Sequence, residues 1–74
     1  MIARILIWGL HDSMTSIDEV RTHLPELDGD DRWITNEVTE RVGLISFGDE
    51  LPDLVELRQL IGKDPDVVEE FEVE

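Results

Sequence analysis

Strand-like and helix-like patterns alternate along this chain in an order that few folds accommodate. The run IARILIW at residues 2–8 is short, apolar and rich in isoleucine, which is typical of a β-strand. An apolar stripe at helical spacing follows, then two strand-like runs, a second helical stripe and a last strand-like run. The predicted order is strand, helix, strand, strand, helix, strand, in a single domain that spans residues 1–74.

Local signals place the ends of the first predicted helix. Ser16 and Glu19 have the spacing of a capping box, in which each side chain satisfies a free backbone N–H at the start of a helix. Pro25 disfavours helical geometry at the preceding residue, so we expect this helix to end or kink at Leu24. Its apolar stripe consists of Ile17, Val20, Leu24 and Leu27.

The remaining elements are predicted from similar patterns. Three further strands are expected at residues 32–38, 41–47 and 67–73. A tight hairpin turn at Thr39 and Glu40 would join the first two of these strands. The second helix is expected to begin at Asp49, to tolerate Pro52 in its first turn and to end at Gly62.

This order is the signature of the ferredoxin-like split β-α-β sandwich, an α+β fold. Its four-stranded antiparallel sheet carries both helices on one face, with the first and third strands central and the others at the edges. The composition agrees, because the predicted central strands are the most continuously apolar. The last strand alternates, with Val67, Phe71 and Val73 on one side and Val68, Glu70, Glu72 and Glu74 on the other. Acidic side chains on an edge strand also discourage aggregation.

The first strand is apolar on both sides, which a monomer with helices on only one face does not need. Ala3, Ile5 and Ile7 point one way, and Ile2, Arg4, Leu6 and Trp8 point the other way. An extended apolar patch on an open sheet usually marks an interface. We predict an interface formed by Leu6, Trp8 and Trp33, used for a homodimer or for another protein partner. The alternatives are a loop or terminus that covers the patch, or tryptophans that lie half exposed.

Composition narrows the classes of partner. With 19 acidic and 6 basic residues, the chain has a net charge of −13, which argues against binding nucleic acid or anionic membrane surfaces. The acidity allows a basic protein partner, a divalent cation, mimicry of DNA, or simple solubility. The chain has no cysteine and no phosphate-loop, dinucleotide or zinc motif, so we expect no cofactor and no metal site. No stretch is long enough to span a membrane and no signal-peptide pattern is present, so we expect a cytoplasmic location.

The stretch GLHDSMTS, residues 9–16, sets His11, Asp12 and Ser13 side by side. These are the residue types of a hydrolytic triad, but triads draw their members from separated positions, so we interpret the stretch as a connector. His11 is the one catalytic candidate. We expect the first and third strands to run parallel as neighbours, which would place His11 near Asp49 and Glu50, where it could bind a metal or act as a base. One interpretation is that His11 is a solvated surface residue without a role. The alternative is that the chain is a small dimeric enzyme or ligand sensor that uses the loop at His11.

The C-terminal half resembles a known family. LVELRQLIGKDPDVVEEFEVE is similar to the final helix, Asp-Pro-x-Val turn and acidic last strand of the inhibitor-type propeptides of subtilisin-family proteases, and RVGLISF resembles their third strand. The resemblance covers about residues 42–73, and the first half shows no further match. It implies the same element order, an open sheet face that packs on a protease, and a role as inhibitor or chaperone. In the family a tail beyond the last strand enters the active site. Here the sequence stops at Glu74, so we do not expect inhibition by that route.

Overall fold

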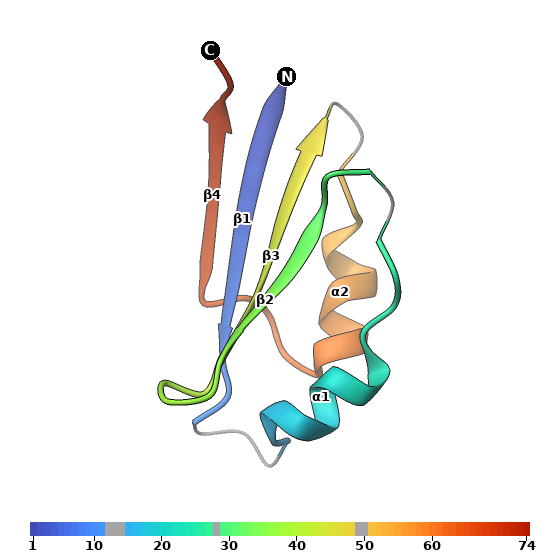
Figure 1. The fold of residues 1–74 in the computed structure, drawn as a ribbon, viewed down its shortest axis with the longest axis vertical. Helices are drawn as coiled ribbons and strands as arrows, with labels where there is room; N and C mark the ends of the chain where they lie inside the picture. The colour runs from blue at the N-terminus through green and yellow to red at the C-terminus, as the bar shows by residue number, and fades with distance from the viewer. Residues whose placement is uncertain (12–14, 28, 49–50) are drawn as a thin grey trace.

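The chain folds as one four-stranded sheet with both helices on the same side of it (Figure 1). The computed structural model describes residues 1–11, 15–27, 29–48 and 51–74. Its elements are β1 (Ile2–Gly9), α1 (Ile17–His23), β2 (Arg32–Asn36), β3 (Arg41–Gly48), α2 (Leu54–Ile61) and β4 (Val67–Glu72). The strand order is β2-β3-β1-β4 and every neighbouring pair is antiparallel. The predicted ferredoxin-like α+β fold, with β1 and β3 in the centre, is therefore confirmed.

One detail of the predicted topology is wrong. β1 and β3 are antiparallel neighbours, with Ile5 opposite Ile45, and not parallel ones. The crossover through α1 returns the chain parallel to β1, and the β2–β3 hairpin then reverses it, so β3 must oppose β1. The end of β1 and the end of β3 consequently lie at opposite ends of the sheet (Figure 1).

The helix boundaries follow from their caps. The Ser16 side chain accepts a hydrogen bond from the backbone N–H of Glu19 at 3.2 Å, and α1 ends just before Leu24, as Pro25 predicted. α2 begins later than expected. The Asp53 side chain caps it by accepting from the Val55 N–H at 2.8 Å, so the prediction that Pro52 lies in the first turn is wrong.

The predicted end of α2 is confirmed, and the predicted start at Asp49 falls outside the described residues. Gly62 takes the left-handed conformation, with φ 95°, and its N–H donates to the carbonyl oxygen of Arg58 at 2.7 Å. A residue with a Cβ is disfavoured in this conformation, so glycine suits the helix end.

The core lies between the helices and one face of the sheet. Leu6 and Trp8 of β1 and Val42 and Leu44 of β3 are completely buried there. The side chains that complete the core are Leu10, Ile17, Val20, Leu57 and Ile61. The Trp8 indole Nε1–H donates to the Lys63 carbonyl oxygen at 3.0 Å, so its polar atom is satisfied inside the apolar surroundings.

Arg4 is a charged residue that is buried on this helix-facing side. Its guanidinium donates a hydrogen bond to the Pro52 carbonyl oxygen. Its neighbours across the sheet are Ser46 on β3 and Glu70 on β4. Arg4 thus ties the beginning of β1 to the segment that leads into α2.

Candidate functional site

The face of the sheet turned away from the helices is strongly apolar, and we call it the open face. Directly opposed residues of antiparallel strands point to the same side, so the strand register assigns each side chain to a face. The apolar side chains of the open face are Ala3, Ile5, Ile7, Ile34, Ile45, Phe47, Val67 and Phe71. Four of them, Ile34, Phe47, Val67 and Phe71, are 40–44% exposed. Because these side chains lie on adjacent strands of one face, they form a patch rather than isolated surface residues.

The residues predicted to form the interface are not on this face. Leu6 and Trp8 are 0% exposed beneath the helices, and Trp33 packs partly buried against the same core. The Trp33 indole N–H donates to the Pro25 carbonyl oxygen at 3.0 Å, which holds it on the helix side. Both sides of β1 are apolar, so the alternation gave two sets of residues without showing which set the helices cover.

β4 shows most clearly that the open face is not an ordinary solvated surface. Val67 and Phe71 pair with Ile7 and Ala3 and therefore lie on the open face. The helix-facing side of the same strand carries Val68, Glu70 and Glu72. On an edge strand of a monomer, apolar residues are expected toward the covered side and acids toward water. In β4 this preference is reversed, so the strand extends the apolar surface away from the core.

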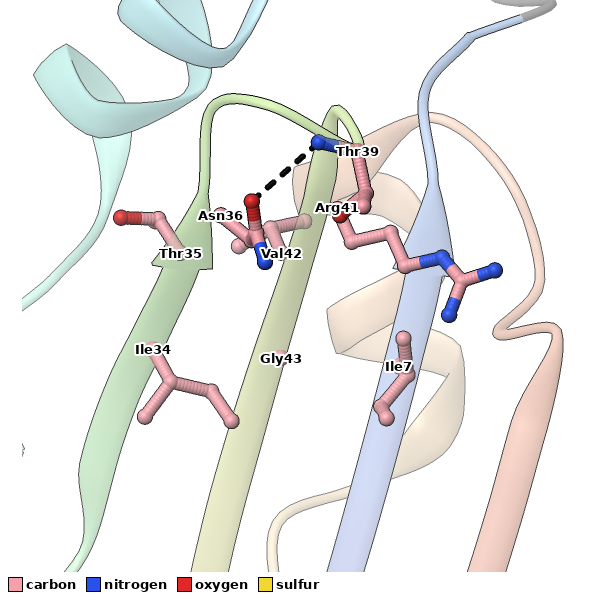
Figure 2. Close-up of a pocket in the computed structure, with 8 residues that line it drawn as sticks. All are labelled: Ile7, Ile34, Thr35, Asn36, Thr39, Arg41, Val42 and Gly43. Atoms are coloured by element: carbon pink, nitrogen blue, oxygen red, sulfur yellow. Dashed lines mark hydrogen bonds between the residues drawn. The ribbon is translucent and has the colours of Figure 1, made fainter.

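A hollow interrupts the open face above Gly43. Its volume is about 360 Å³, and Figure 2 shows Ile34 on one side of Gly43 and Ile7 on the other. A Cβ built on Gly43 would stand 2.8 Å from Ile34 Cγ1 and 3.0 Å from the Leu6 carbonyl oxygen. The glycine is therefore required by the close approach of its neighbours. The Ile34 side chain leans over Gly43, and the hollow is bounded by Ile34, Ile7 and Arg41.

The rim of the hollow is polar and lies near the β2–β3 hairpin. Arg41 extends from β3 over the end of the sheet, as Figure 2 shows. The Asn36 side chain accepts hydrogen bonds from the N–H groups of Val38 and Thr39, at 3.0 and 3.2 Å. These bonds hold the hairpin turn, and Glu40 takes a positive φ of 53° to close it.

The charges of the open face are few and separated. Arg32 on β2 and Arg41 on β3 are basic, and Glu69 on β4 is acidic. Arg32, Ile45, Ile5 and Glu69 form one row across the sheet, with a positive charge at one edge and a negative charge at the other. The chain as a whole has a net charge of −13. On its open face, however, basic residues outnumber acidic ones among the described residues.

His11 lies at the far end of the molecule from the place predicted for it. It follows β1, whereas Arg4 and Pro52 join the start of β1 to the approach to α2. Asp12, Ser13, Asp49 and Glu50 fall outside the described residues, but the antiparallel arrangement of β1 and β3 removes the basis for placing the two loops together. His11 is exposed and stands against Gly9, near Asp66.

Asp66 secures this end of the sheet. Its Oδ2 accepts from the Gly9 N–H at 2.6 Å and lies 3.3 Å from the Lys63 ammonium, which itself donates to the Gly9 carbonyl oxygen at 2.9 Å. The hydrogen bond from the Gly9 N–H is the largest cause of the lowered pKa of Asp66; desolvation opposes it, and the Lys63 ammonium lowers the pKa further. These contacts hold the end of β1 against the turn before β4.

The described residues offer little support for metal chemistry. Within residues 1–11, 15–27, 29–48 and 51–74, no group of three or more His, Asp or Glu side chains could hold a metal ion. Nor does any helix in that part of the chain have the length and apolar content to cross a membrane.

No protein-family model and no curated protein sequence matches the chain. The chemistry of the open face therefore carries the functional inference.

Proposed function

We propose that this chain is an acidic protein-interaction module that binds through its open face. The observation that carries the proposal is the reversed pattern of β4, where Val67 and Phe71 face away from the helices. Removing a side chain such as Phe71 from water contributes about 1.5–3 kcal/mol when its burial is complete. Phe71 is 44% exposed, so a partner could still bury a large part of this side chain, and several such residues on one face are typical of a binding surface.

Site-specific photocrosslinking tests the proposal. A benzophenone amino acid replaces Phe47, which lies on the open face, and in a control chain it replaces Val55, which is 60% exposed on α2. In the native cells we expect position 47 to capture a protein, either this chain or another, that position 55 does not capture. No adduct at position 47, or the same adducts at both positions, contradicts the proposal.

A second candidate is an inhibitor or folding chaperone of a subtilisin-type protease, as the resemblance over residues 42–73 implies. Two features support it: the element order that the family has, and an apolar open face where the family contacts its protease. A peptidase assay and a refolding assay with subtilisin test this role. Unchanged activity and unchanged refolding in an excess of the chain would remove it.

A further inference from the structure

We infer that the open face binds a second copy of the same chain, through a two-fold axis that runs along the strands between β1 and β3. The inference rests on the proposed function and names its partner. A homodimer needs a surface that is complementary to itself. The rows of side chains that cross the open face meet this requirement when β1 of one copy lies over β3 of the other and β2 lies over β4.

The charged row shows the complementarity most directly. In the order β2, β3, β1, β4 this row reads Arg32, Ile45, Ile5, Glu69. A two-fold axis along the strands sets Arg32 of each copy opposite Glu69 of the other, with the isoleucines stacked between the two pairs. A two-fold axis across the strands through the same row would set Arg32 on Arg32 and Glu69 on Glu69. Opposed like charges are unfavourable, so the row selects the axis along the strands.

In each neighbouring row, one of the two central strands carries a small residue and the other a large one. The next row sets the Gly43 hollow of β3 beside Ile7 of β1. The two-fold axis exchanges these strands, so Ile7 of each copy enters the hollow above Gly43 of the other. In the row on the far side, Ala3 of β1 pairs with Phe47 of β3, and the same exchange sets each Phe47 on an Ala3. Sheets pack about 10 Å apart, so a large side chain of one copy that faces a small one of the other can pack without a clash.

The distribution of charge favours a copy of this chain over an unrelated basic protein. The chain has a net charge of −13, so a strongly basic partner would be drawn to the acidic surfaces elsewhere. The open face carries Arg32 and Arg41 against Glu69, which gives no attraction for a basic partner. Its row Arg32, Ile45, Ile5, Glu69 is apolar in the middle and carries opposite charges at the two edges, so this row is complementary to the same row of a second copy.

Charge reversal tests the arrangement by sedimentation velocity and light scattering across a range of concentrations. Arg32→Glu and Glu69→Arg each place like charges across the two-fold axis, so each should weaken dimerisation about tenfold or more. The double variant Arg32→Glu/Glu69→Arg restores opposite charges and has the same net charge as the wild type. It should recover most of the lost affinity.

Matched controls separate the position of a charge from its amount. Arg58→Glu and Glu56→Arg make the same changes of net charge on the exposed surface of α2, away from the open face. They should leave the dissociation constant within about threefold of the wild type, since exposed charges contribute little at a distance. Melting temperatures of all variants check that each chain folds.

A crosslinking experiment gives a second measurement that does not depend on the ion pair. The chain has no cysteine, so Arg32→Cys and Glu69→Cys each introduce one unique thiol. A short bismaleimide should link a mixture of the two chains and leave either chain alone largely unlinked. Equal linking in all three samples would overturn the arrangement.

The possible failures are distinguishable. A wild-type chain that stays monomeric at every concentration overturns the inference, while the proposed function then depends on whether position 47 captures another protein. A wild-type dimer in which the double reversal is no tighter than either single reversal overturns the two-fold arrangement alone. A dimer with reciprocal rescue and selective crosslinking supports both.

Discussion

Trp8 gives the most direct test of the structure. Its truncation should strongly destabilise the fold if it lies in the core, and much less if it lies on an exposed interface. Trp8 is 0% exposed, and its indole N–H donates to the Lys63 carbonyl oxygen. Truncating a buried tryptophan to alanine costs about 3–5 kcal/mol. Stabilities near 0.05–0.15 kcal/mol per residue give about 4–11 kcal/mol for 74 residues, so Trp8→Ala should remove much or all of the folding free energy.

Urea unfolding followed by far-UV circular dichroism measures this loss. All variants are compared at one low protein concentration, because association would add to the apparent stability. Trp8→Phe keeps an aromatic ring but loses the hydrogen bond to Lys63, and should cost less, with the lost bond accounting for about 1 kcal/mol. Val67→Ala, on an exposed edge of the open face, is the surface control and should cost less than about 1 kcal/mol. A Trp8→Ala chain within 1 kcal/mol of wild type would show that Trp8 is not in the core.

Three further predictions test local parts of the fold. Gly43→Ala should cost about 1–3 kcal/mol in urea unfolding, because the new Cβ meets Ile34 and the Leu6 carbonyl; unchanged stability would contradict that close packing. Ser16→Ala should cost about 1 kcal/mol through loss of the α1 cap, while Ser16→Asp, which keeps an acceptor, should cost much less. The pKa of Asp66 is lowered in the fold, so its contribution to stability is present above the unfolded pKa near 3.8 and is lost as pH falls through the folded value. Asp66→Asn should therefore lose less stability than the wild type on acidification, and parallel pH profiles would refute the role of Asp66.

The element order and most boundaries were predictable because their signals are local. Ser16 and Pro25 act within a few residues of themselves, and both the start of α1 and its end at Leu24 are as expected. Gly62 likewise ends α2. The start of α2 was missed because Asp49 and Asp53 are both suitable caps, and the sequence alone does not rank them.

Local signals could not show which face of the sheet the helices cover, because that depends on tertiary packing. Alternation separates Ile5 and Ile7 from Leu6 and Trp8, but the helices can cover either set. The register joins Leu6 to Leu44 and Trp33 on one side and Ile5 to Ile45 on the other, and burial shows that the helices cover the side of Leu6. The pattern of β4 does not resolve this from the sequence, because Val67 and Phe71 would be expected on the covered side, yet they lie with Ile7 and Ala3 on the open face.

The acidity of the chain and its apolar face have opposite effects on association, and their placement reconciles them. A net charge of −13 makes copies repel one another when they approach by their acidic surfaces, which opposes indiscriminate aggregation. On β4 the acids Glu70 and Glu72 lie on the helix side, whereas the open face carries only Glu69 among the described acids. The repulsion is therefore weakest where the apolar surface is largest. Association is therefore favoured through the open face and disfavoured through the acidic surfaces. This distribution is the one expected of a protein that binds a specific partner through one face.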